Sequence, residues 1–175
     1  MVWAWYAKDY FNKPPYNDIY IQGWTHTNTV IRMLNGNTLI SPRNFHFLVE
    51  VDPQGSVVRT IGEGILSYPH DPEVLPIGNI LIANQRIPHH AVEIDPKSGA
   101  ALWRSPPFPP ETWPVRDANR LRNGNTLITG TSAIAEVTPE GKVVWRLKLK
   151  NATFRPGDPA AAGLGFYKAE RISAP

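Results

Sequence analysis

The chain has 175 residues, of which 42% are apolar and 19% are charged, and this composition is typical of a globular domain with a hydrophobic core. The net charge of +3 is small and the basic residues are scattered among acidic ones, so neither nucleic acid nor a membrane surface is an expected partner. The absence of cysteine excludes disulfides and thiolate metal sites.

The first segment, "MVWAWYAKDY", has neither the basic start nor the long apolar run of a signal peptide. No stretch of the sequence approaches the roughly 18–20 apolar residues of a membrane-spanning helix. The sequence therefore does not indicate a compartment.

Three turns of similar sequence divide the chain into repeats. They are "LNGNTLIS" at 34–41, "LPIGNILIAN" at 75–84 and "LRNGNTLITG" at 121–130. A second turn follows each one: "DPQG" at 52–55, "DPKSG" at 95–99 and "TPEG" at 138–141. A repeat of about 40–45 residues with four short strand signals predicts the blades of a β-propeller, an all-β fold of four-stranded antiparallel sheets.

The expected strands follow from apolar alternation and turn chemistry, because Asn-Gly and Asp-Pro-x-Gly accept the backbone angles of tight turns. In the first repeat they are 27–34, 37–43, 46–52 and 56–61. In the second they are 70–75, 79–84, 90–95 and "ALWRS" at 101–105, and in the third 116–121, 125–130, 133–138 and 142–149. No convincing amphipathic helix is found.

The last of these strands, "KVVWRLKLK", alternates in the manner of a half-buried strand. Val143, Trp145, Leu147 and Leu149 share one face, and Lys142, Arg146, Lys148 and Lys150 share the other. Trp3, Trp103 and Trp145 are expected at matching strands, in the core or between blades, because tryptophan supplies a large area to bury.

Both ends of the chain resemble parts of a blade. "VWAWY" at 2–6 resembles a fourth strand, and "GFYKAERI" at 165–172 resembles an innermost strand. Residues 1–175 are thus expected to form a single propeller domain or part of one, with three complete blades. Since propellers typically have 4–8 blades, either another copy, in a dimer or other homo-oligomer, or a missing N-terminal part is expected to complete the ring.

Polar residues gather in the loops that lead into the innermost strands: "GWTHTN" at 23–28, "SYPHDPE" at 67–73 and "WPVRDANR" at 113–120. In a propeller such loops meet around the central channel. The residues expected there are His26, Asn28, His70, Asp71, Arg116 and Asp117, with Arg43 of "SPRNF" reaching the same mouth. Arginine suits a tetrahedral oxyanion, and a neutral histidine can act as a nucleophile or a general acid–base.

Each of these residues can instead have a structural role. His26 and Asn28 can cap a loop, His70 and Asp71 can close a turn, and Arg116 can pair with Asp117 around the channel. His46, His89 and His90 are expected on the surface or on strand faces. No metal site is expected, because no histidine pair has ligand spacing and the adjacent His89 and His90 would point to opposite faces of a strand.

Several of these segments carry a resemblance. "WTHTNTV" at 24–30 with "LISPRN" at 39–44, "PHDPEVLPIGNIL" at 69–81, "WPVRDANRLRNGNTLIT" at 113–129 and "GFYKAERI" resemble the arylsulfotransferase family. Its members are propellers that move a sulfuryl group from an aryl sulfate to a phenol. The resemblance covers most of the chain.

The resemblance implies that His70 is the nucleophile that becomes sulfated. It also implies that His26, Asn28 and Arg43 bind the sulfuryl oxygens. Arg116 is a further substrate-binding candidate because of its residue type and its place in an inner-strand loop. Aryl sulfates and phenols would be the substrates, and no cofactor is expected. The alternative is a propeller without catalysis, a binding or assembly module that self-associates, because a propeller scaffold supports many functions.

Overall fold

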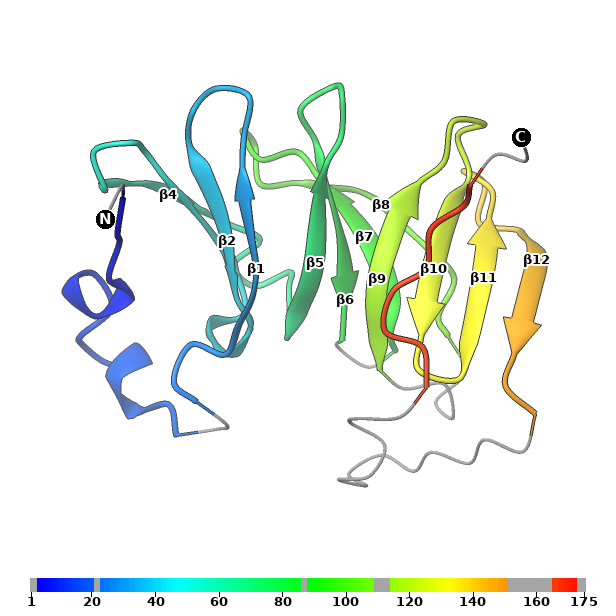
Figure 1. Cartoon of the computed structure of the whole chain (residues 1–175), viewed down its shortest axis with the longest axis horizontal. Coiled ribbons are helices and arrows are strands. Elements are labelled where there is room, and N and C mark those ends of the chain that lie inside the picture. Colours follow the sequence, from blue (N-terminus) through cyan, green and yellow to red (C-terminus); the bar gives the residue numbers. More distant parts are fainter. Residues whose placement is uncertain (1–2, 21–22, 86–87, 109–113, 151–164, 173–175) are drawn as a thin grey trace. The chain divides into compact units, whose positions relative to one another are not determined.

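A computed structural model describes residues 3–20, 23–85, 88–108, 114–150 and 165–172. The strands of this described part form three antiparallel sheets of four strands each (Figure 1). The chain divides into two compact units, residues 1–69 and 70–175. The all-β prediction and the three four-stranded blades are confirmed.

Unit 1 contains one sheet, in which neighbouring strands in sequence pair in the order β1-β2-β3-β4. These strands are β1 (Thr27–Arg32), β2 (Thr38–Pro42), β3 (Leu48–Val51) and β4 (Val57–Ile61). Gly36, at φ +86°, makes the β1–β2 turn possible, and the Asn37 amide donates to Asn35 Oδ1 at 2.9 Å across that turn. The predicted Gly-Asn turn is therefore confirmed in detail.

An aromatic cluster covers one face of this sheet. Phe11, Phe45 and Phe47 are buried. The ring centroid of Phe11 lies 5.3 Å from that of Phe45 and 5.7 Å from that of Phe47. Ile40, Val49 and Val51 of the sheet complete the cluster. Three short 3-10 helices lie in this unit: η1 (Ala7–Asp9), η2 (Tyr16–Asp18) and η3 (Arg43–Phe45).

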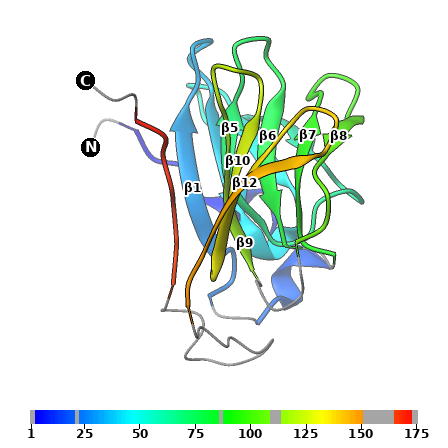
Figure 2. The same cartoon turned by 90° about the vertical axis from the view of Figure 1, so that its right-hand side faces the viewer.

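Unit 2 contains two sheets, with strand orders β5-β6-β7-β8 and β9-β10-β11-β12 (Figures 1 and 2). The first comprises β5 (Pro69–Val74), β6 (Ile80–Asn84), β7 (His90–Ile94) and β8 (Ala101–Arg104). The second comprises β9 (Val115–Arg120), β10 (Thr126–Gly130), β11 (Ala133–Val137) and β12 (Val143–Lys148).

The two sheets of unit 2 pack on one shared core. Ile128 on β10 lies opposite Ala118 on β9 and Ala135 on β11, so that three buried side chains share one face. Leu81 and Ala83 of β6 belong to the same core cluster. Alternation of small and large apolar residues lets the sheets pack face to face, as blades of a propeller do.

The prediction of a half-buried last strand is wrong. All six residues of β12 are exposed, and Trp145 on this strand is 45% exposed. β12 is the outermost strand of its sheet. Figure 2 turns this end of unit 2 toward the viewer, with β12 in front. Alternation along a strand predicts which side chains share a face, but the element packed on that face decides their burial.

The terminal segments are not regular strands in the part of the chain that the structure describes. Residues 3–6 and 165–172 have no strand assignment, and residue 2 of the predicted first strand lies outside the described residues. The described residues contain no helix long and apolar enough to cross a membrane.

Candidate functional site

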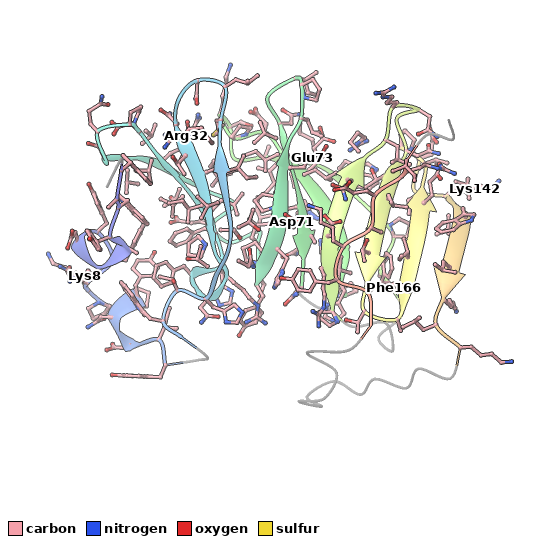
Figure 3. All side chains as sticks on the ribbon, viewed as in Figure 1. Lys8, Arg32, Asp71, Glu73, Lys142 and Phe166 are labelled. Atoms are coloured by element: carbon pink, nitrogen blue, oxygen red, sulfur yellow. The ribbon has the colours of Figure 1, made fainter. Side chains whose placement is uncertain are left out.

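A group of polar side chains in unit 2 lies on β5, on β9 and on the C-terminal segment 165–172. We call this group the inner-strand cluster; Figure 3 shows Asp71 and Glu73 of it beside the C-terminal segment that carries Phe166. Its members are His70, Asp71 and Glu73 on β5, Arg116, Asp117 and Asn119 on β9, and Tyr167 and Lys168 on the segment. The Asn119 amide donates to Ala169 O at 3.3 Å and ties the segment to β9.

Repeat register explains why these residues meet. Asn28, His70 and Arg116 each lie eight residues before the glycine of a Gly-Asn turn, so they occupy the same position of successive repeats. The segment "AERI" at 169–172 matches "ANRL" at 118–121, and this alignment places Tyr167 at the same repeat position as Arg116. Equivalent innermost strands put equivalent positions on the same edge of the blades.

The ring of Tyr167 joins two of the predicted site residues. The Arg116 guanidinium carbon lies 5.1 Å from the centroid of this ring, and the His70 ring lies edge-on at a centroid distance of 6.4 Å. Arg116 Nε also donates to Thr131 Oγ1 at 3.3 Å. His70 and Arg116 are both 8% exposed, so the cluster holds a cation and an imidazole out of bulk water.

Burial changes the proton affinity of the arginine. Removal from water lowers the pKa of Arg116, and interaction with Tyr167 acts in the opposite direction. A desolvated guanidinium keeps its positive charge, and a neighbouring anion stabilises it more than it would stabilise an exposed guanidinium. The arrangement can therefore hold an oxyanion, and binding of one stays a prediction.

Two carboxyl groups lie together beside this pair. Asp117 is 1% exposed, and burial, followed by the charge of Asp71, raises its pKa to about 6. The Asn119 amide donates to Asp117 Oδ2 at 2.7 Å and opposes that rise. Lys168 Nζ donates to Asp71 Oδ2 at 3.0 Å. One carboxyl thus pairs with a cation while its neighbour holds a proton more readily than usual.

Glu73 links the two innermost strands. Its Oε2 accepts the Arg120 backbone amide at 2.7 Å, and burial raises the pKa of the Glu73 carboxyl. This hydrogen bond fixes β5 against β9 at the point where the cluster lies.

The remaining predicted site residues, His26, Asn28 and Arg43, belong to unit 1. Asn28 Nδ2 donates to Pro69 O at 2.9 Å, which supports the structural alternative for this side chain. The Arg43 guanidinium carbon lies 4.5 Å from the centroid of the Tyr68 ring. His26 is half-buried at φ 45°. That these three residues share a site with His70 and Arg116 stays a prediction.

His46 is half-buried and lies outside the strands, and His89 is buried and lies outside the strands, so the predicted surface or strand-face position is wrong for His89. His46 caps η3 in the left-handed region, its Nδ1 accepts the Tyr68 amide at 3.1 Å, and burial and then Arg43 lower its pKa. His89 is 3% exposed, and burial lowers its pKa. His90 lies half-buried on β7, in agreement with a strand-face position.

Sequence reasoning missed Tyr167, Lys168, Glu73 and Asn119. The segment "GFYKAERI" is predicted as an innermost strand, and the alignment of its "AERI" with "ANRL" is the signal that gives Tyr167 and Lys168 the positions of Arg116 and Asp117. Within the described residues, no group of three or more His, Asp or Glu side chains is placed to hold a metal ion.

No family model and no curated protein matches the sequence. Among solved structures, the chain is similar to a protein of unknown function from Bacteroides caccae, with a TM-score of 0.57 and 20% identity over 73% of this chain and 52% of that one. It is also similar to a streptogramin B lyase, with a TM-score of 0.54 and 13% identity over 74% of this chain and 43% of that one.

A third similar structure is a catalytically inactive variant of virginiamycin B lyase from Staphylococcus aureus with quinupristin. Its TM-score is 0.54, with 12% identity over 81% of this chain and 45% of that one. The chain thus spans about half the length of the solved proteins it matches. At these identities the likeness establishes a fold class, and that class is a β-propeller-like one.

Proposed function

We propose that this chain forms part of an arylsulfotransferase-like propeller, in which the inner-strand cluster binds the sulfuryl group of an aryl sulfate. The observation that carries the proposal is the placement of Arg116 and His70 on the same Tyr167 ring, both withdrawn from water. The resemblance of "PHDPEVLPIGNIL" to the family supplies the chemistry, because it assigns the nucleophile to His70.

The proposed reaction has two steps. A nitrogen of neutral His70 forms a bond to sulfur as the bond from sulfur to the aryl oxygen breaks, and the phenolate leaves. In the second step a phenol oxygen bonds to sulfur, the N–S bond breaks and the phenol proton passes to solvent. Arg116 stabilises the sulfuryl oxygens, on which negative charge gathers in both steps.

Turnover of a chromogenic aryl sulfate with a phenol acceptor tests this proposal. We expect release of the phenol by the wild type, loss of release in His70→Ala, and a fall of about 100-fold in kcat/KM in Arg116→Ala. His90→Ala is the matched control, because His90 lies on β7 outside the cluster. Equal rates in all four proteins would mean that neither His70 nor Arg116 takes part in the reaction.

The second candidate is a binding or assembly module without catalysis. It is favoured by the 8% exposure of His70, since a nucleophile must be reached by its substrate. Sulfate binding by calorimetry that Arg116→Ala weakens, with no turnover by the wild type, selects this candidate.

A further inference from the structure

One contact recurs where a blade meets the innermost strand of the next. In unit 2, Trp103 Nε1 donates to Pro139 O at 2.7 Å, and Arg120 lies over the Trp103 ring at 5.1 Å. Arg120 Nη2 also pairs with Glu93 Oε2 at 2.5 Å. The β5–β8 sheet supplies the tryptophan and the glutamate, and the β9–β12 sheet supplies the arginine and the turn carbonyl.

Unit 1 repeats half of this contact with its own N-terminal segment. Trp3 Nε1 donates to Pro53 O at 3.2 Å, and Arg32 lies over the Trp3 ring at 5.3 Å. Arg32 and Arg120 also each donate to the carbonyl of their turn glycine, Gly36 and Gly124. The β1–β4 sheet is therefore an acceptor for a tryptophan-bearing strand, and Trp3 occupies it.

The β9–β12 sheet carries the other side of this contact, the tryptophan and the glutamate. Trp145 on β12 and Glu136 on β11 match Trp103 and Glu93, and Arg171 of the C-terminal segment pairs with Glu136 as Arg120 pairs with Glu93. A cavity of about 280 Å³ lies between this face and the segment; its lining includes Leu127, Ile134, Glu136, Trp145, Arg171 and Ile172.

We propose that the Trp145 face of one copy binds the β1–β4 sheet of a second copy, where Trp145 takes the place of Trp3. In this contact Trp145 Nε1 donates to Pro53 O of the second copy, and Arg32 of the second copy lies over the indole ring. Glu136 and Arg32 carry opposite charges, so Arg32 replaces Arg171 as the partner of the carboxylate.

The occupant is a second copy because the chain carries both complementary halves. The partner must offer an arginine four residues before a turn glycine, and a Pro carbonyl in the turn between the third and fourth strands; Arg32, Gly36 and Pro53 meet both conditions. Each copy gives one Trp145 face and one acceptor sheet, so a two-fold dimer is the simplest closed form of this contact.

Light scattering after size exclusion, on the full chain across concentrations, tests the interface. We expect the wild type to form dimers, and Trp145→Ala and Arg32→Ala each to weaken dimerisation at least about 10-fold. Val144→Ala is the matched control, because Val144 lies on the opposite face of β12 and is similarly exposed, at 49% against 45%. Circular dichroism and thermal melting confirm that each variant is folded.

Two further arms separate this contact from a general loss of structure. Trp3→Ala frees the acceptor, so dimerisation should strengthen. An equimolar mixture of Trp145→Ala and Arg32→Ala should recover part of the dimer, because one intact interface forms in each mixed pair. A wild-type chain that stays monomeric at about 100 µM, or a Trp145→Ala variant that dimerises like the wild type, overturns the proposal.

Discussion

Gly165 lies directly against Thr131, the residue that follows β10. The Phe166 amide donates to Thr131 O at 2.8 Å, and a Cβ on Gly165 would stand 2.2 Å from that oxygen. Gly165 also has φ +91°, a value that side chains disfavour. This contact holds the C-terminal segment, and with it Tyr167, on the β9–β12 sheet.

Gly165→Ala should therefore release the C-terminal segment. The segment would lose its hydrogen bond to Thr131 and the pairing of Lys168 with Asp71. We expect faster hydrogen exchange at 166–172 and a fall of about 1–3 kcal/mol in the free energy of unfolding. Gly99→Ala is the control, because Gly99 has φ +71° but nothing within 4 Å of its Cβ position. Equal exchange in the two variants would contradict the role of the close contact.

Asp117→Asn should make the chain more stable at neutral pH. Asp117 holds its proton up to a pKa of about 6, against an ordinary value of 3.8, so the folded state binds more protons between these values. Wild-type stability therefore falls as pH rises through this window, by up to about 3 kcal/mol. The variant lacks this titration, so its advantage should grow from pH 4 to pH 7.

Urea unfolding of both proteins at pH 4, 5, 6 and 7 measures this difference. The wild type and Asp117→Asn should be closest at pH 4 and most different at pH 7 and above. A constant difference across the series would mean that Asp117 titrates in its ordinary range, and that burial next to Asp71 leaves it unaffected.

The fold was largely predictable because turn chemistry is local. Gly36, Gly78 and Gly124 all have positive φ, and the strands begin and end within a few residues of the predicted bounds. The exposure of Trp145 was not predictable, because it depends on which element packs on β12 and not on the alternation along that strand.

The candidate site was predictable only in part. His70 and Arg116 stand out as polar residues at the start of innermost strands. The raised pKa of Asp117 depends first on its burial and then on Asp71. Repeat spacing puts Asp71 and Asp117 at the same position of neighbouring repeats, but it does not show that Asp117 is buried. The role of Tyr167 is seen only when the segment lies against β9, because there its ring contacts Arg116 and His70.

Asn28→Ala tests whether this amide is structural. Asn28 Nδ2 and Ser41 Oγ both donate to Pro69 O, at 2.9 and 3.2 Å. Loss of one of these two bonds should lower the free energy of unfolding by about 1 kcal/mol. Ser41→Ala gives the paired comparison. If Asn28→Ala leaves thermal stability unchanged but abolishes turnover of an aryl sulfate, Asn28 binds substrate, as the family resemblance implies.

Arg116→Lys should weaken sulfate binding although it keeps the positive charge. Arg116 offers a planar fork, and its guanidinium lies over the Tyr167 ring at 5.1 Å. Lysine replaces that fork with a compact, strongly hydrated ammonium that cannot donate in parallel to two oxygens of a tetrahedral anion. We expect sulfate affinity to fall about 10-fold by calorimetry, which corresponds to about 1.4 kcal/mol. Arg104→Lys, at an exposed position on β8, is the control and should bind as the wild type does. Unchanged affinity in Arg116→Lys, with both variants folded, would mean that the anion meets only a diffuse positive charge at this position and no bidentate contact.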